Sequence, residues 1–189
     1  MHYTGTVWRP PYDVNSLLLE GTAGCTHHKC KFCTLYDDIP FKFRMSPLED
    51  IEADLKEVKG HFRLWKFNRV SRTFLVGDNP FVLKASRLLD ISSLIKKYFS
   101  TNQSICCFSR IKDITLKTDE ELIELRKAGY NWLTIGIETG DEEALEFMNK
   151  GYKAQDIITQ CKRLYNLGIS CNFFYLTGIS GIGRLEKRT

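Results

Sequence analysis

The sequence has no long apolar run, no secretory leader pattern and no large excess of charge of either sign. None of its 189 residues belongs to a stretch that approaches the roughly 20 apolar residues a membrane-spanning helix needs. The first residues, Met1–Thr6, lack the basic and then apolar segments of a signal peptide. The formal net charge of +4 is too small to indicate nucleic acid or an anionic membrane as the main partner.

Low-complexity segments and interdomain linkers are also missing, so the sequence predicts one domain over residues 1–189. Its 43% hydrophobic and 26% charged residues are ordinary for a globular chain. Seven cysteines without a leader favour a reducing compartment, the cytoplasm, and therefore thiols in place of disulfides. Four of them lie in apolar or helical contexts and are expected to be small buried residues: Cys106, Cys107, Cys161 and Cys171.

Apolar runs alternate with amphipathic segments along the chain. The runs predict five strands, near residues 16–20, 73–76, 104–108, 132–137 and 170–176. Helix signals stand between them: Thr118 with Glu121 forms a capping box and Gly129 a stop, while Ser46 with Glu49 predicts another helix start. Buried strands separated by helices predict an α/β fold, a partial (β/α) barrel with parallel strands and about five β/α units. The fifth unit lacks its helix, so we expect a core that is incomplete at the C-terminal end.

Three cysteines stand close together after the first predicted strand. Cys25, Cys30 and Cys33 have the spacing C-x4-C-x2-C, and no fourth cysteine follows within seventy residues. Three thiolates can hold an inorganic centre and leave one metal position open for a substrate or a second cofactor. Zinc bound by the three cysteines and His27 or His28 is an alternative that the spacing alone allows.

Polar or glycine-bearing loops follow the other four predicted strands. In a parallel β/α sheet, ligands collect at the carboxyl ends of the strands. These loops supply the remaining candidate site residues: Gly77, Asp78, Asn79, Ser109, Arg110, Glu138 and Gly178.

This layout resembles the radical S-adenosylmethionine (radical SAM) superfamily. The resemblance rests on the three cysteines after strand one, on Phe32 before the last of them, and on the segment Gly136-Ile137-Glu138-Thr139-Gly140. The superfamily usually has the spacing C-x3-C-x2-C, so this chain carries one extra residue. The superfamily core has six β/α units, and by that standard the chain looks truncated.

The resemblance runs from about Tyr3 to Gly183. Its first part, Tyr3-Thr4-Gly5 with Arg9-Pro10-Pro11, is similar to a branch near the coproporphyrinogen-oxidase-like and methylthiotransferase-like proteins. It implies a 4Fe–4S cluster on Cys25, Cys30 and Cys33, with S-adenosylmethionine (SAM) on the open iron. It also implies reductive cleavage of SAM to a 5′-deoxyadenosyl radical, oxidoreductase chemistry on an unknown substrate, and an electron donor such as flavodoxin or ferredoxin.

The resemblance also implies roles for the loop residues, each with an ordinary alternative. Asp78, beside Gly77 and Asn79, would accept from the methionyl ammonium, or would form a simple turn. Arg110, after Ser109, would pair with the methionyl carboxylate, or would be a surface charge. Glu138 would bind the ribose hydroxyls, or would favour the start of the next helix. Gly178 would let the backbone approach the adenine, or would belong to a flexible end.

Two other classes of function remain open at the level of sequence. The chain can be a non-catalytic remnant that binds a metal or a partner, or a zinc-binding structural module. A stretch of interleaved basic and aromatic residues, Phe62 to Arg72, resembles single-stranded nucleic acid sites. We interpret it as a packed connection, so a nucleic acid partner is not expected. The fifth strand would be an uncovered edge, which predicts self-association into a homo-oligomer.

Overall fold

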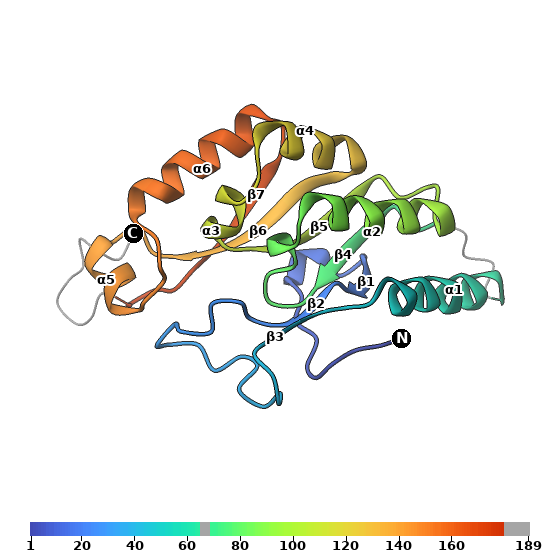
Figure 1. Cartoon of the computed structure of the whole chain (residues 1–189), viewed down its shortest axis with the longest axis horizontal. Helices are drawn as coiled ribbons and strands as arrows, with labels where there is room; N and C mark the ends of the chain where they lie inside the picture. The colour runs from blue at the N-terminus through green and yellow to red at the C-terminus, as the bar shows by residue number, and fades with distance from the viewer. Residues whose placement is uncertain (65–68, 180–189) are drawn as a thin grey trace.

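The computed structural model of the chain describes residues 1–64 and 69–179, with only the backbone described at 62–64. Five strands form one sheet in the order β1-β4-β5-β6-β7, and all neighbouring pairs are parallel (Figure 1). This arrangement confirms the predicted α/β fold. The strands are β1 (Leu17–Glu20), β4 (Arg72–Val76), β5 (Ser104–Ser109), β6 (Tyr130–Glu138) and β7 (Ser170–Tyr175).

The long helices cover one face of this sheet, and shorter ones join the strands (Figure 1). The main core lies between these helices and the sheet: Leu55, Leu88, Leu125 and Leu164 are fully buried there. The helices are α1 (Leu48–Leu64), α2 (Ala85–Tyr98), α3 (Ile111–Thr115), α4 (Asp119–Ala128), α5 (Glu142–Phe147) and α6 (Ala154–Asn166), with single 3-10 turns η1 (Pro11–Asp13) and η2 (Pro80–Val82).

The opposite face of the sheet has its own smaller core. Successive residues of a strand point to opposite faces, so Phe74 and Val76 lie on this face while Leu75 joins the main core. The N-terminal segment lies against the same face: Val7 packs there, and the Tyr12 hydroxyl is 3.0 Å from Thr134 Oγ1. This segment therefore forms part of the wall around any ligand bound over the sheet.

The predicted start and end of α4 were correct, whereas the predicted cap at the start of α1 was wrong. The Thr118 hydroxyl accepts from the Glu121 N–H at 3.2 Å, and Gly129 ends α4 with a φ of 116°. The Ser46 hydroxyl does not complete a capping box; it donates to Glu20 Oε1 at 3.3 Å. The first carbonyl of α1 that accepts a helical hydrogen bond is that of Pro47, so Ser46 stands one residue too early to cap.

A small antiparallel pair was not predicted. Strand β2 (Thr22–Gly24) pairs with β3 (Phe43–Met45), and the cysteine-bearing segment leaves and returns between them. Gly24 has a φ of 76°, and a Cβ there would lie 2.3 Å from the Lys42 carbonyl oxygen. Only glycine tolerates both conditions, so Gly24 closes the base of the cysteine segment.

Of the four cysteines outside the C-x4-C-x2-C segment, only two are buried as predicted. All seven cysteines are free, and Cys106 and Cys107 are buried, but Cys161 and Cys171 are only half-buried because they lie between α6 and the edge strand β7. None of the helices described is long and apolar enough to cross a membrane. Residues 65–68, part of the basic and aromatic stretch, and residues 180–183, the end of the segment that resembles the superfamily, lie outside the described residues.

Candidate functional site

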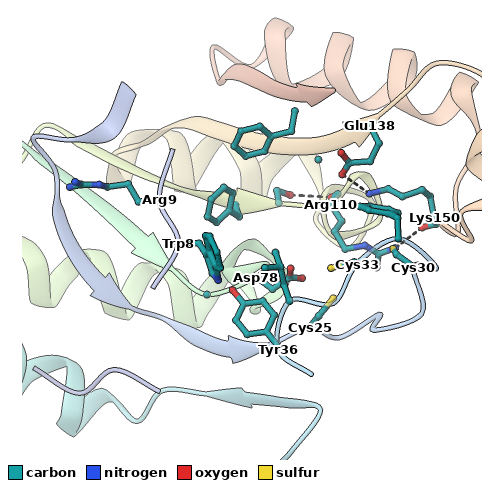
Figure 2. A pocket seen from close by; sticks show the side chains of 17 residues that line it. Trp8, Arg9, Cys25, Cys30, Cys33, Tyr36, Asp78, Arg110, Glu138 and Lys150 are labelled. Carbon is teal, nitrogen blue, oxygen red and sulfur yellow. Dashed lines mark hydrogen bonds and ion pairs between the residues drawn. The ribbon is translucent and has the colours of Figure 1, made fainter. Parts of the chain in front are cut away.

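A pocket of about 270 Å³ opens at the carboxyl ends of the strands (Figure 2). Four successive strand–loop segments contribute to it, as expected for a parallel sheet. It brings together eight of the ten residues singled out in the sequence: Cys25, Cys30, Cys33, Gly77, Asp78, Ser109, Arg110 and Glu138. The rest of the lining is mostly aromatic or basic: Trp8, Arg9, Phe32, Leu35, Tyr36, Phe108, Gly136, Lys150 and Phe174.

The three cysteines enter this pocket from the segment between β2 and β3, and Figure 2 shows their sulfur atoms on one side of it. Burial, followed by the charge of Asp78, raises the pKa of Cys25 to about 12. Burial also raises the pKa of Cys30 and of Cys33. The three groups are therefore thiols in the metal-free protein, and a bound cation would be needed to hold them as thiolates.

Both histidines of the cysteine segment have other partners. His27 Nε2 donates to the Asn149 carbonyl at 2.6 Å, and His28 Nε2 lies 3.0 Å from Asp37 Oδ1. In the part of the chain described, no three Cys, His, Asp or Glu side chains are placed to hold a single metal ion. A cluster needs no such convergence on one ion, because each thiolate binds a different iron. The donor set therefore fits a cluster with one open iron, and a Cys3His zinc site is not favoured.

The loop after β4 places Gly77 and Asp78 in the pocket but turns Asn79 away. Gly77 has a φ of 121°, and a Cβ there would lie 2.3 Å from the Thr22 carbonyl oxygen. Burial raises the pKa of Asp78, while Cys25, Arg110 and Lys150 act in the opposite direction. Asp78 is thus a carboxyl group held among polar partners next to the thiols.

Asn79 and Gly178 do not line the pocket. Asn79 is fully buried, and its Nδ2 donates to Thr26 Oγ1 at 2.9 Å and to Asp113 Oδ2 at 3.0 Å. It therefore ties the cysteine segment to the start of α3. Gly178 is exposed with a φ of 78°, and among the described residues no atom beyond its chain neighbours lies within 4 Å of the position its Cβ would take.

Arg110 is fixed at the junction of β5 and α3. Its backbone N–H donates to Asp113 Oδ2 at 2.8 Å, and its Nη2 donates to the Lys150 carbonyl at 2.6 Å. The Ser109 hydroxyl donates to the Arg110 carbonyl at 3.0 Å. The guanidinium group is thereby held at the pocket wall, with further N–H groups beyond those used in these contacts.

Glu138 and Lys150 form a buried ion pair at the pocket wall. Glu138 Oε1 lies 3.0 Å from Lys150 Nζ, and the two side chains are 11% and 5% exposed. The ammonium also lies 5.5 Å from the centre of the Phe32 ring and 5.6 Å from that of Tyr152. Glu138 has a φ of 63°, a conformation that a non-glycine residue rarely adopts, at the point where β6 ends.

Sequence reasoning missed Lys150, Trp8 and Tyr36. Lys150 follows Asn149 and precedes Gly151 in an ordinary turn pattern, which gives no sign that the ammonium is buried. Trp8 arrives from the N-terminal segment, far from the strand–loop pattern that pointed to the other residues. Figure 2 shows the rings of Trp8 and Tyr36 beside Asp78.

Comparison with known proteins agrees with the resemblance that the sequence shows. The sequence model of the Radical SAM superfamily matches residues 19–184. The heme chaperone HemW of Buchnera aphidicola subsp. Schizaphis graminum is 22% identical over 157 residues, which cover 80% of this chain and 40% of that protein. The chain thus spans less than half the length of this curated relative.

Solved structures share the fold at low sequence identity. The cobalamin-dependent S-adenosylmethionine radical enzyme OxsB, with aqua-cobalamin and S-adenosylmethionine bound, matches with a TM-score of 0.72 and 19% identity over 92% of this chain and 26% of that one. Coproporphyrinogen III oxidase (HemN) from Escherichia coli matches with a TM-score of 0.59 and 20% identity over 86% of this chain and 37% of that one. At these identities the likeness shows the fold alone.

Proposed function

The chain belongs to the radical SAM superfamily, and from that premise we propose that its pocket binds a 4Fe–4S cluster and S-adenosylmethionine and cleaves the latter reductively. Members of this superfamily bind both cofactors. The observation that carries the proposal is the convergence of three thiols, two carboxyl groups and three cationic side chains from separate segments on one pocket. When bound and reduced, the cluster supplies the electron that splits SAM into methionine and a 5′-deoxyadenosyl radical.

In this proposal Cys25, Cys30 and Cys33 hold the cluster, and the surrounding charges orient SAM. Asp78 accepts from the methionyl ammonium, while Arg110 and Lys150 face the methionyl carboxylate as fixed cations.

Glu138 accepts from the ribose hydroxyls, and its ion pair with Lys150 holds the carboxylate in place at the pocket. The aromatic residues Trp8, Tyr36 and Phe174 exclude water from the space where a radical would form.

The single electron comes from a low-potential donor such as flavodoxin or ferredoxin, and the substrate is unknown. We place the chain in the cytoplasm, where free thiols persist, and regard residues 1–189 as one radical SAM core domain.

The test is anaerobic reconstitution with iron and sulfide, followed by iron analysis and electron paramagnetic resonance of the reduced protein. Cys25→Ala, Cys30→Ala and Cys33→Ala should each abolish the 4Fe–4S signal, because a cluster on two thiolates is not retained. Cys161→Ala is the matched control, since this half-buried thiol lies outside the pocket, and it should take up iron normally. A normal signal in any of the three pocket variants would refute the ligand assignment.

A further inference from the structure

The turn between α5 and α6 is attached to the cysteine segment by three hydrogen bonds. We call residues 148–151 the clamp turn and residues 25–33 the cysteine loop. The Asn149 carbonyl accepts from His27 Nε2 at 2.6 Å, and Asn149 Nδ2 donates to the Lys29 carbonyl at 3.1 Å. The Lys31 N–H donates to the Met148 carbonyl at 3.0 Å. One asparagine therefore holds the loop with both its backbone and its side chain.

The shape of the clamp turn depends on its sequence. Asn149 has a φ of 58°, a left-handed conformation that asparagine tolerates better than most residues. Gly151 has a φ of 80°, and a Cβ there would lie only 3.2 Å from His27 Cε1. The turn thus leaves a space that accepts the imidazole ring of His27 and aims the Asn149 carbonyl at it.

The four residues between Cys25 and Cys30, residues 26–29, are also held at the end next to Cys25. Thr26 Oγ1 accepts from the buried Asn79 side chain at 2.9 Å. His28, one of these four residues, has a φ of 44°, so the backbone reverses locally between the two attached ends. Four residues therefore fit between the first two cysteines without loosening the loop.

The clamp turn also contacts the charged residues of the pocket. Lys150 lies inside the turn, its ammonium pairs with Glu138 at 3.0 Å, and its carbonyl accepts from Arg110 Nη2 at 2.6 Å. One short turn consequently contacts the loop that carries the thiols and both Glu138 and Arg110. Figure 2 shows the contacts of Lys150 with Glu138 and Arg110 as dashed lines.

From these contacts we propose that Asn149 and His27 are positioning residues that preorganise the cysteine loop before any cluster is bound. A free loop of nine residues would have to be ordered at the moment of metal uptake, at an entropic cost for every residue. A loop already docked on the clamp turn presents its three thiols at fixed spacing. The identity of the bound group rests on the function proposed above, whereas the docking itself concerns the metal-free chain.

The test is amide hydrogen exchange on the cluster-free protein, read by mass spectrometry on peptides that cover residues 25–33. Asn149→Gly removes the side-chain donor and keeps a residue that accepts a positive φ. Exchange in these peptides should quicken about tenfold, the change expected when one ordinary hydrogen bond is lost from a local opening equilibrium. Peptides from β4 and β5 should be unchanged, which separates loop release from general unfolding.

His27 offers a matched series. His27→Ala should quicken exchange in the same peptides, and His27→Gln should restore most of the protection, because its amide nitrogen can donate from a similar position. His61→Ala, at an exposed position on α1, should match the wild type. Equal exchange in the wild type, Asn149→Gly and His27→Ala would overturn the proposal, as would a wild-type loop that exchanges like an unstructured chain.

Iron uptake separates this proposal from the proposed function. Upon reconstitution, the Asn149→Gly and His27→Ala proteins should incorporate iron more slowly than the wild type, with His27→Gln intermediate. If the cysteine loop is protected from exchange but the protein never binds iron, the proposed cluster is refuted, whereas the docking of the loop on the clamp turn is supported. If the wild type incorporates iron but its cysteine loop is unprotected from exchange, the docking of the loop is refuted, whereas the proposed cluster is supported.

Discussion

At the scale of single residues, Glu138 and Lys150 depend on each other for their burial. A buried charge that loses its partner is left desolvated and uncompensated. Glu138→Ala should therefore lower the free energy of unfolding of the metal-free protein by about 3 kcal/mol, measured by denaturant titration. Glu138→Ala combined with Lys150→Met should recover most of this loss, because no unpaired charge remains. Losses that simply add in the double variant would show that the two groups do not interact.

Gly77 is the residue whose backbone conformation is most constrained at the pocket. Its φ of 121° and the 2.3 Å approach of the Thr22 carbonyl leave no place for a Cβ. Gly77→Ala should destabilise the protein by about 2 kcal/mol or more, since both strain and a clash are introduced.

Gly60 is the natural comparison for Gly77. It lies in α1, and among the described residues no atom beyond its chain neighbours and its own helix backbone lies within 4 Å of its Cβ position, so Gly60→Ala should stabilise the helix by about 0.5–1 kcal/mol. The two variants are compared by thermal unfolding. Similar melting temperatures for both would contradict the conformational argument.

At the scale of elements, the sequence identified the parts with a clear period and missed the short ones. All five parallel strands were predicted to within two residues at each end, because each contains an apolar run. The β2–β3 pair has three residues per strand, and α3 has five, too few for a period to be recognised. Both missed elements shape the site: one encloses the cysteine loop, and the other carries Asp113, which fixes Arg110 and Asn79.

Strand β7 has a partner on one side only, among the strands described. Phe174 points into the pocket and lies 6.0 Å from the Phe108 ring, while Phe173 and Tyr175 lie on the other face and are 38% and 58% exposed. An edge with exposed aromatic residues favours strand–strand association. We therefore predict that sedimentation shows species larger than the 21.9 kDa monomer.

A charge on this edge should reverse the association. Phe173→Lys should shift the protein toward monomer, because a lysine on an edge strand disfavours pairing with a second strand. Ile158→Lys, on the exposed side of α6, is the control and should change nothing. A wild-type protein that sediments as a monomer at every concentration would contradict the prediction.

At the scale of the whole molecule, the sequence placed most of the pocket because a parallel sheet gathers its loops at one edge. That rule located the residues that follow strands, such as Asp78, Arg110 and Glu138. It gave no information about Lys150, which follows a helix, or Trp8, which precedes the first strand. Their positions depend on how the N-terminal segment and the α5–α6 turn pack, and no local pattern encodes such packing.

The most direct test of the account is the cleavage of SAM by the reconstituted protein. Under anaerobic conditions, with dithionite as reductant, the wild type should form 5′-deoxyadenosine and methionine in equal amounts, even without its substrate. Cys30→Ala should form neither. A wild-type protein that holds a reducible 4Fe–4S cluster and binds SAM, yet produces no 5′-deoxyadenosine, would contradict the central claim that this pocket performs radical SAM chemistry.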